Sequence, residues 1–353
     1  MHFFGGRSVV VLSIDGGGIR GLIAARVLEH LEKLLHRRNC FRPIGDLFDL
    51  IAGSSTGALI GLGLTMPPRT GIPYLQGEPF DPADSDIGMK RICEIYNRLG
   101  KTVFPPDHFF TLRTVRQAFM QKYSTEPFER LLNSIFGDTT LHDCRNNLLV
   151  TAYDTVRRMP YLFKFRRSQP DKYPNFYLRD VSRATTAAPT YFKPALIHQL
   201  SPDSDQALNE YCLIDGAVFQ NNPAMTAYVE ARKIFPKAKK ITIVSLGSGR
   251  LHGAYRYDDI QGWGYMDWVS PMRNVPILTI MSDAQTSMST YQLTRHKGVS
   301  LYRINQDLDG NVSEDMDDAR PENIQAIEAF AQRLIQSRSG SLDQIADLLA
   351  RRC

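Results

Sequence analysis

Short apolar runs alternate along this chain with longer segments whose apolar positions recur at helical spacing. The strand-like runs are Val9 to Ile14, Phe48 to Ala52, Asn147 to Tyr153, Tyr161 to Phe165, Tyr211 to Ile214 and Ile241 to Leu246. Buried strands that alternate with helices are typical of a parallel sheet covered by helices. The pattern therefore predicts an α/β fold with a largely parallel central sheet flanked by helices.

The first two units of this pattern read strand, glycine turn, helix, strand, serine turn, helix. Apolar residues from Ile19 to Leu35 keep helical spacing, and Arg37 and Arg38 suit the negative end of that helix. Ligands of such sheets gather beyond the carboxyl ends of the strands. Both turns are therefore expected on one side of the molecule, at a common site.

No linker divides the 353 residues, so we expect a single domain over 1–353. Residues 66–88 are rich in proline and glycine, and the segment that follows carries several phenylalanines. The region 66–128 could form a lid over an acyl channel, or it could be a surface loop and a packing segment. Apolar stripes within 322–350 predict two helices that pack on the core rather than anchor in a membrane.

The serine turn is Gly53-Ser54-Ser55-Thr56-Gly57. In a Gly-x-Ser-x-Gly turn the serine sits on a strained strand-to-helix connection, where the glycines let neighbouring backbones pass. The earlier turn, Asp15-Gly16-Gly17-Gly18-Ile19-Arg20-Gly21, opens a helix and offers backbone N–H groups. Acyl transfer needs such donors for the developing oxyanion. The two turns together predict a nucleophile, Ser55, and its oxyanion hole.

A nucleotide site is the rival interpretation of the glycine turn, because Gly16-x-Gly18-x-x-Gly21 matches the dinucleotide fingerprint. That fingerprint expects an acidic residue near the end of the next strand, where this chain has Gly53 to Gly57. A P-loop would need a lysine that is missing here. The serine turn therefore favours acyl chemistry over a nucleotide cofactor.

A serine hydroxyl needs a base to take its proton. His252 and His296 are the histidines late enough in the chain for the common hydrolase order. Asp215 is the stronger candidate, because it ends an apolar strand and precedes Gly216 and Ala217. A carboxylate at that position can face a pocket and serve as the base directly.

These signatures, Asp-Gly-Gly-Gly-x-Arg-Gly, Gly-x-Ser-x-Gly and Asp-Gly-Ala in that order, resemble those of the patatin-like phospholipases. The resemblance spans about residues 8–250 and includes 184–192 and 221–223. It implies a serine-aspartate dyad of Ser55 and Asp215, with the amides of Gly16, Gly17 and Gly18 as oxyanion donors. Asp15, Arg20, Gly21, Gly53, Gly57, Gly216 and Ala217 support the motifs.

The length of the chain and its segments 302–305 and 316–319 also resemble bacterial patatin-like phospholipases that cyclic dinucleotides activate in antiviral signalling. This resemblance implies an activator such as cyclic GMP-AMP and a role in antiphage defence. An off state is physically plausible, because a free phospholipase would damage the membrane of its host.

Composition limits the partners. The net charge of +5 suits an anionic membrane surface, and no dense basic run indicates a nucleic-acid polymer as partner. The five cysteines are scattered, odd in number and without metal-ligand spacing, which favours a reducing cytoplasm and no structural zinc. No apolar run is long enough to cross a bilayer, so membrane contact would be peripheral and transient, at its inner face.

The sequence thus predicts hydrolysis of a phospholipid acyl ester through an acyl-enzyme on Ser55, with no metal and no cofactor. Alternatives remain open. The same dyad could serve a constitutive lipid acyl hydrolase, a thioesterase or an acyltransferase, or the serine turn could belong to a non-catalytic nucleotide-binding or lipid-binding module.

Overall fold

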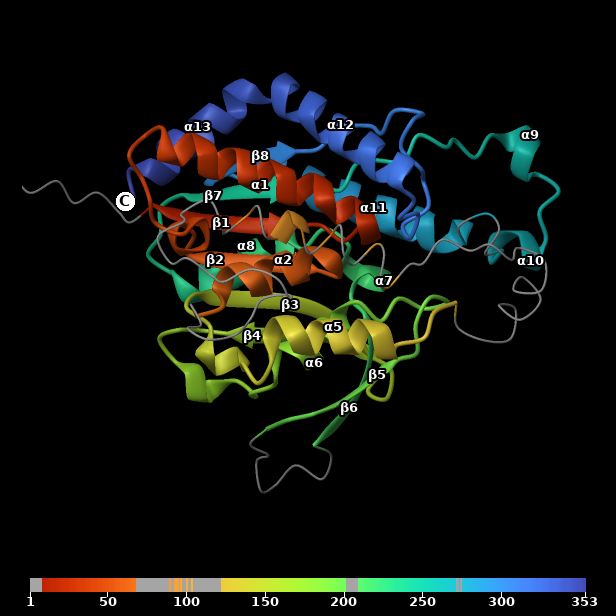
Figure 1. Ribbon diagram of the computed structural model, residues 1–353, viewed down its shortest axis with the longest axis horizontal. Helices are drawn as coiled ribbons and strands as arrows, with labels where there is room; N and C mark the ends of the chain where they lie inside the picture. Colours follow the sequence, from red (N-terminus) through yellow and green to blue (C-terminus); the bar gives the residue numbers. More distant parts are fainter. Residues whose placement is uncertain are drawn as a thin grey trace, which may run out of the picture.

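One sheet of eight strands runs through the described part of the computed structural model (Figure 1). The order across the sheet is β5, β6, β3, β2, β1, β7 and β8, with β4 paired to β3. The strands are β1 (Val9–Ile14), β2 (Leu50–Ser54), β3 (Asn147–Asp154), β4 (Met159–Phe165), β5 (Ala195–His198), β6 (Glu210–Asp215), β7 (Ile241–Leu246) and β8 (Val299–Ile304).

The structure describes residues 8–67, 122–200, 209–270, 273 and 275–353, and in addition 89, 92–94, 96, 100 and 103. The region 66–128, expected as a lid, lies mostly outside the described residues.

The centre of the sheet is parallel. β3, β2, β1, β7 and β8 pair in parallel, whereas β4 and β6 run antiparallel to β3 and β5 runs antiparallel to β6. All six residues of β1 and of β7 are buried, as expected for strands covered on both faces. The expected α/β class with a mostly parallel central sheet is therefore confirmed.

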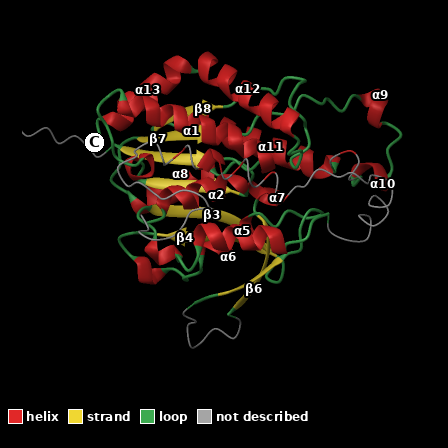
Figure 2. Ribbon diagram, in the orientation of Figure 1, coloured by secondary structure: helices red, strands yellow, loops and turns green. Residues whose placement is uncertain are grey.

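Helices cover both faces of this sheet (Figure 2). One face packs against α1 (Gly21–His36), α2 (Thr56–Thr65), α5 (Glu126–Phe136), α6 (Leu178–Thr185), α12 (Pro321–Ser337) and α13 (Ser339–Ala350). The other face packs against α8 (Ala224–Ile234) and the C-terminal part of α11 (Pro276–Arg295). Residues 322–350, expected as packing helices, lie in α12 and α13, and both helices contact α1.

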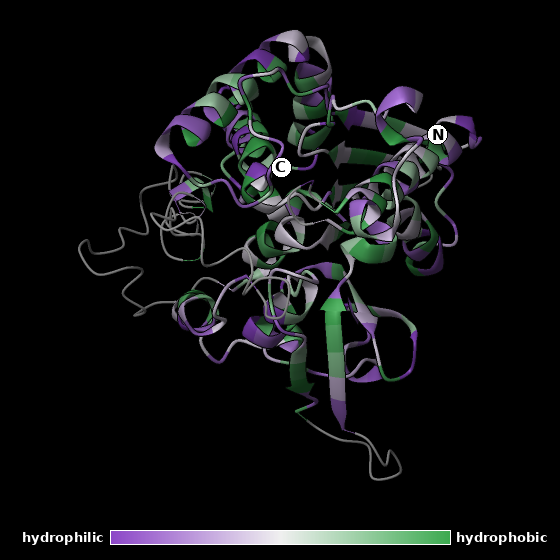
Figure 3. Cartoon of the chain, turned by 90° about the vertical axis from the view of Figure 1, so that its right-hand side faces the viewer, coloured by the Kyte–Doolittle hydropathy of each residue, from purple (hydrophilic) through white to green (hydrophobic). Residues whose placement is uncertain are grey.

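Three short helices complete the described α-helices: α7 (Ala217–Gln220), α9 (Tyr257–Ile260) and α10 (Tyr265–Trp268). In Figure 1, α9 and α10 lie at the right-hand extremity, away from the sheet. Seen from that side, the interior strands are hydrophobic and the surrounding helices have mixed colours (Figure 3). The β5 and β6 pair projects from the body in the same view.

Two cysteines far apart in the sequence meet at the end of α1. Cys40 and Cys353, separated by 313 positions, form a disulfide, while Cys93, Cys144 and Cys212 are free thiols. Disulfides persist in oxidising compartments and are rare in reducing ones. The cysteine spacing favours a reducing compartment, and a protein in such a compartment is not expected to contain this disulfide.

Within the described residues, no helix combines the length and the apolar character required to span a bilayer.

Candidate active site

Ser55 lies on the turn between β2 and α2, with φ 51° and ψ −127°. A positive φ is unfavourable for a residue with a side chain, and such strain persists where the surroundings fix it. Gly57 has no room for a Cβ, which would collide with the carbonyls of Ile14 and Asp15 at the end of β1. The local sequence thus lets β1 and α2 approach closely and turns the Ser55 side chain outward.

Hydrogen bonds through two buried threonines hold the backbone of Ser55 in place. Its N–H donates to Thr185 Oγ1 at 3.0 Å, and the Thr185 hydroxyl donates to the Thr151 carbonyl at 2.7 Å. All these groups are buried. Buried polar groups that are fully paired rigidify their surroundings, so this network holds the strained turn in place.

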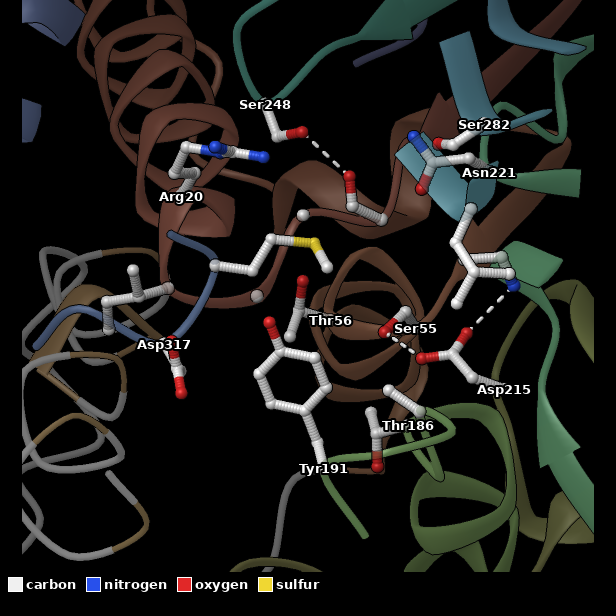
Figure 4. A pocket seen from close by; sticks show the side chains of 18 of the residues that line it. Arg20, Ser55, Thr56, Thr186, Tyr191, Asp215, Asn221, Ser248, Ser282 and Asp317 are labelled. Carbon is white, nitrogen blue, oxygen red and sulfur yellow. Dashed lines mark hydrogen bonds between the residues drawn. The ribbon is translucent and has the colours of Figure 1, made fainter. Parts of the chain in front are cut away.

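Asp215 ends β6 and faces Ser55 (Figure 4). The Ser55 hydroxyl donates to Asp215 Oδ2 at 2.6 Å, and the Ala217 N–H donates to Oδ1 at 2.8 Å. The sheet explains why two residues 160 positions apart meet. β2 and β6 pair with successive parts of the same edge of β3, where Ser54 is in register with Thr151 and Asp215 with Ala152, while β4 pairs with the other edge.

The carboxyl of Asp215 is shielded from solvent. Burial raises its pKa to about 7, although the hydrogen bonds from the Ser55 hydroxyl and the Ala217 N–H act in the opposite direction. A carboxylate with a pKa near the working pH can both accept and return a proton. The hydrogen bond and the raised pKa together make proton transfer between Ser55 and Asp215 chemically accessible.

The glycine turn passes beside Ser55 and is braced by three segments. The Gly16 N–H, included above among the expected oxyanion donors, donates to the Asn221 carbonyl at 3.1 Å. The Ser248 hydroxyl donates to the Gly16 carbonyl at 2.7 Å, and the Ile19 N–H donates to the Met316 carbonyl at 2.8 Å. The N–H groups of Gly17 and Gly18 make no hydrogen bond to any described residue. These two amides are therefore the ones left to meet a ligand.

Asp15 and Arg20 take buried positions around this turn. Both oxygens of Asp15 accept from Arg303 of β8, at 2.9 and 2.5 Å, which ties the end of β1 to the edge strand. Arg20 donates to the Glu314 carbonyl at 2.7 Å, while its Nε has no partner among the described residues. Burial lowers the pKa of the Arg20 guanidinium. Asp15 thus supports the turn rather than reaching Ser55.

The remaining motif glycines are sites of close backbone packing. A Cβ would collide with Tyr96 at Gly21, with Ala58 at Gly53 and with Thr151 at Gly216. Ala217 follows Gly216 and supplies the N–H that holds the Asp215 carboxylate.

A cavity of about 180 Å³ opens in front of Ser55 and Asp215. Its walls include Gly17, Gly18, Arg20 and Asn221, together with apolar side chains. The apolar wall is made by Leu59, Val103, Phe128, Phe192, Leu251, Val275 and Leu278. An apolar pocket with a few convergent polar groups is the usual form of a small-molecule site.

The cavity wall contains no histidine among the residues described. His296 contacts Tyr228 at 3.2 Å, and His252 is exposed. Neither of the alternative bases considered above contacts Ser55. Among the described residues, no three His, Cys, Asp or Glu side chains come together in a group that could hold a metal ion.

Gly18 offers a direct test of the turn. Its φ is +56°, and a Cβ there would collide with the carbonyl of Met316. We expect Gly18→Ala to displace the turn and to lower kcat about 10²–10³-fold if one oxyanion donor is misplaced. Gly310→Ala is the matched control, because no atom lies within 4 Å of its Cβ position. Steady-state kinetics and thermal melting should separate the two variants; equal behaviour would show that Gly18 serves no such role.

Several residues around the site are not recognisable from the sequence. Thr185, Ser248 and Arg303 reach the two turns only through the packing of distant strands and helices, and none lies in a Gly-x-Ser-x-Gly or glycine-cluster pattern. Thr185, Asn221 and Arg303 lie in segments noted above only for their resemblance, which gave none of them a role. A polar residue at the end of each buried strand is the one signal that could have indicated Ser248.

The chain is similar in sequence to known proteins. The family model described as "Patatin-like phospholipase" matches residues 12–228, more than half of the chain. The chain is 29% identical to Patatin-like protein 2 of Arabidopsis thaliana, over 94% of this chain and 84% of the plant protein. It is 30% identical to Patatin-like protein 3 of the same plant, over 81% and 70%.

More distant similarity extends to other sources. Patatin-2-Kuras 3 of Solanum tuberosum is 27% identical, over 94% of this chain and 84% of the potato protein. The solved structure of VipD from Legionella pneumophila covers 94% of this chain at 12% identity, with a TM-score of 0.35, which does not by itself establish a common fold. On the match of its family model, the chain belongs to the patatin-like phospholipases, a family of lipid acyl hydrolases.

Proposed function

We propose that the protein hydrolyses acyl esters of membrane phospholipids through a covalent intermediate on Ser55, with Asp215 as the base. The observation that carries the proposal is the hydrogen bond of 2.6 Å from the Ser55 hydroxyl to Asp215 Oδ2, at the wall of an apolar cavity. The nucleophile and the base are within hydrogen-bond reach, and the base is oriented by a further donor, the Ala217 N–H.

In the first half of the proposed reaction, Asp215 takes the proton of the Ser55 hydroxyl while Oγ attacks the ester carbonyl carbon. The carbonyl oxygen becomes an anion, and collapse of the tetrahedral intermediate breaks the bond to the alcohol. The proton held by Asp215 passes to the departing alkoxide, which leaves as the lysolipid. In the second half, water loses a proton to Asp215, attacks the acyl-enzyme and releases the fatty acid, and the proton returns to Ser55 Oγ.

We assign the oxyanion hole to the N–H groups of Gly17 and Gly18. Both residues line the cavity beside Ser55, and their N–H groups have no acceptor in the described chain. Donors that are already oriented cost no reorganisation when the charge develops. The Gly16 amide is left out of this assignment, because its donation to Asn221 occupies it.

The raised pKa of Asp215 predicts how activity depends on pH. The base works as the carboxylate, so its active form accumulates as pH rises through the value of about 7. We expect kcat/KM to fall about tenfold for each unit of pH below that value and to level off above it. A profile of a soluble ester substrate between pH 5 and pH 9 checks this. A flat profile over that range would contradict a base with this pKa.

Regulation by a cyclic dinucleotide is part of the proposal, and the position of one segment supports it. Met316 and Asp317, from the tail segment 316–319, line the cavity, and the Met316 carbonyl holds the glycine turn through Ile19. A ligand that displaced this segment would displace the proposed oxyanion donors. Hydrolysis of a fluorogenic phospholipid should then be slow for the protein alone and should become faster when cyclic GMP-AMP is added. Full activity without ligand, and no response to a panel of cyclic dinucleotides, would remove the regulatory proposal and leave the hydrolase.

We also propose action at the cytoplasmic face of the membrane, in antiphage defence. The Cys40–Cys353 pair provides a test of the compartment. Alkylation of the protein in intact cells should find both thiols free if the compartment is reducing. Complete protection of both cysteines from alkylation would contradict a cytoplasmic location.

Product analysis tests the substrate class. Mixed phospholipid vesicles incubated with the protein should release fatty acid and lysolipid, and Ser55→Ala should release neither. Transfer of the acyl group to an added alcohol in place of water would identify an acyltransferase. Cleavage of acyl thioesters without phospholipid cleavage would identify a thioesterase.

A further inference from the structure

Large apolar side chains are exposed mainly on one part of the molecule, the arm that carries α9 and α10 and the outer face of α11. The described chain has fifteen exposed large apolar side chains, and nine of them lie between residues 255 and 291. They are Tyr255, Tyr257, Tyr265, Met266, Ile277, Ile280, Met281, Met288 and Tyr291. Exposed apolar patches of this kind mark contact with a membrane or a protein.

The residues on α11 form a stripe. Ile277, Met281, Met288 and Tyr291 recur at intervals of three, four and seven, which places them on one side of the helix, with Ile280 beside them. The opposite side of α11 is occupied. Leu278, Thr279, Ser282 and Asp283 line the cavity, and Ser289 and Leu293 are buried. One helix therefore carries a wall of the cavity on one side and an exposed apolar stripe on the other.

This arrangement places the stripe close to the chemistry. An α-helix with its side chains is about 10–12 Å across, so the cavity lies roughly one helix diameter behind the stripe. In Figure 1 the arm with α9 and α10 extends from the same region as α11. A bilayer in contact with this face would therefore lie about one helix diameter from the cavity.

The stripe on α11 contains no acidic residue, and Arg295 and Lys297 follow it. The arm carries both signs of charge, with Arg256 and Arg273 beside Asp258, Asp259 and Asp267, and Arg273 pairs with Asp267 at 3.7 Å. Basic residues at the edge of an apolar face attract anionic headgroups. The arm adds aromatic side chains: Trp263 contacts Trp268 at 5.0 Å between centroids, and Arg273 lies 5.0 Å from the Trp263 ring. Tyrosine and tryptophan favour the boundary between hydrocarbon and water.

We propose that the outer face of α11 and the adjoining arm form the surface by which the protein docks on a phospholipid bilayer. This inference rests on the proposed function and names the partner surface of the same site. Docking there buries the exposed stripe and holds the cavity next to the substrate layer. Binding to the bilayer and the chemistry at Ser55 are carried by different residues, so the two can be separated by mutation.

The test uses the double variant Met281→Glu/Met288→Glu, which places two carboxylates on the stripe without touching the cavity wall. The matched control is Val156→Glu/Met159→Glu, at the turn between β3 and β4, where the two residues are 64% and 52% exposed. Binding is measured by flotation with vesicles of phosphatidylcholine and phosphatidylglycerol, in a Ser55→Ala background. Hydrolysis of the same vesicles and of a soluble short-chain ester is measured with Ser55 intact.

We expect the stripe variant to bind vesicles roughly a hundredfold more weakly, since burial of one methionine corresponds to about a tenfold change in affinity. Vesicle hydrolysis should fall in parallel, whereas turnover of the soluble ester should stay within about twofold of the wild type. The control variant should keep both activities.

Three outcomes would overturn the docking surface: unchanged flotation of the stripe variant, an equal loss in the control variant, or a change from dimer to monomer caused by the stripe substitutions, which would identify the face as a subunit interface. Failure of the proposed function gives a different result. In that case the wild type would cleave neither ester, while flotation would still report on docking.

Discussion

Ser55→Ala is expected to abolish ester hydrolysis while the protein still folds. The substitution removes the nucleophile, and the corresponding loss in a well-studied serine hydrolase is roughly 10⁶-fold in kcat. The turn itself should persist, because the hydrogen bond from the Ser55 N–H to Thr185 uses only the backbone. Binding to lipid vesicles should also persist, since the substitution leaves the proposed docking surface on α11 and the arm unchanged. Fatty acid release from vesicles and thermal melting of the purified variant measure the two properties.

The control for this variant is Ser54→Ala, the neighbouring serine of the same turn. Ser54 is fully buried, and its hydroxyl accepts from Thr151 rather than from a carboxylate. Ser54→Ala is expected to lower stability and to retain turnover. Substantial hydrolysis by Ser55→Ala, at a level comparable with Ser54→Ala, would rule out Ser55 as the nucleophile.

Asp215→Asn is expected to lower kcat by about 10²–10⁴-fold, the usual contribution of a general base. The amide keeps the shape of the side chain but cannot take the serine proton. His252→Ala and His296→Ala serve as controls, because neither histidine lines the cavity. Retained activity in Asp215→Asn together with loss in either histidine variant would replace the dyad by a triad.

The same substitution has an expected effect on stability. Because burial raises the pKa of Asp215 to about 7, from about 3.9 in an unfolded chain, the folded state binds its proton more tightly. The carboxyl therefore lowers the free energy of unfolding progressively as pH rises between those two values. Asparagine carries no charge, so Asp215→Asn should melt at or above the wild-type temperature at pH 8. A stability cost that grows with pH would contradict this origin of the pKa shift.

The sequence pattern predicts the central strands well and the edges poorly. Val9–Ile14 and Ile241–Leu246 are predicted to the residue, because both are fully buried apolar runs. β2 begins two residues later than predicted and includes Gly53 and Ser54. β5 and β8 are missed: β5 has four residues that alternate between buried and exposed, and β8 is a half-buried edge strand. Edge strands lack the continuous apolar run that identifies a buried one.

The sequence likewise predicts some features of the candidate site and not others. The positions of Ser55 and Asp215 follow from motifs that act locally, since Ser55 directly follows β2 and Asp215 ends β6 of the same sheet. The hydrogen bond of the Gly16 amide cannot be predicted from the sequence, because its acceptor, the Asn221 carbonyl, belongs to a turn 205 positions later. Arg303 likewise reaches Asp15 only because β8 lies beside β7. Partners brought together by long-range packing leave no periodic signal in the sequence.

The most direct test of the proposed dyad is to trap the acyl-enzyme and locate it. The protein is incubated with an excess of a fluorophosphonate or a slowly hydrolysed ester, its intact mass is measured, and the modified peptide is mapped. We predict a single adduct on Ser55, absent from Ser55→Ala and formed much more slowly in Asp215→Asn. An adduct on another residue, or labelling of Ser55→Ala at the wild-type rate, would contradict the assignment of Ser55 as the nucleophile.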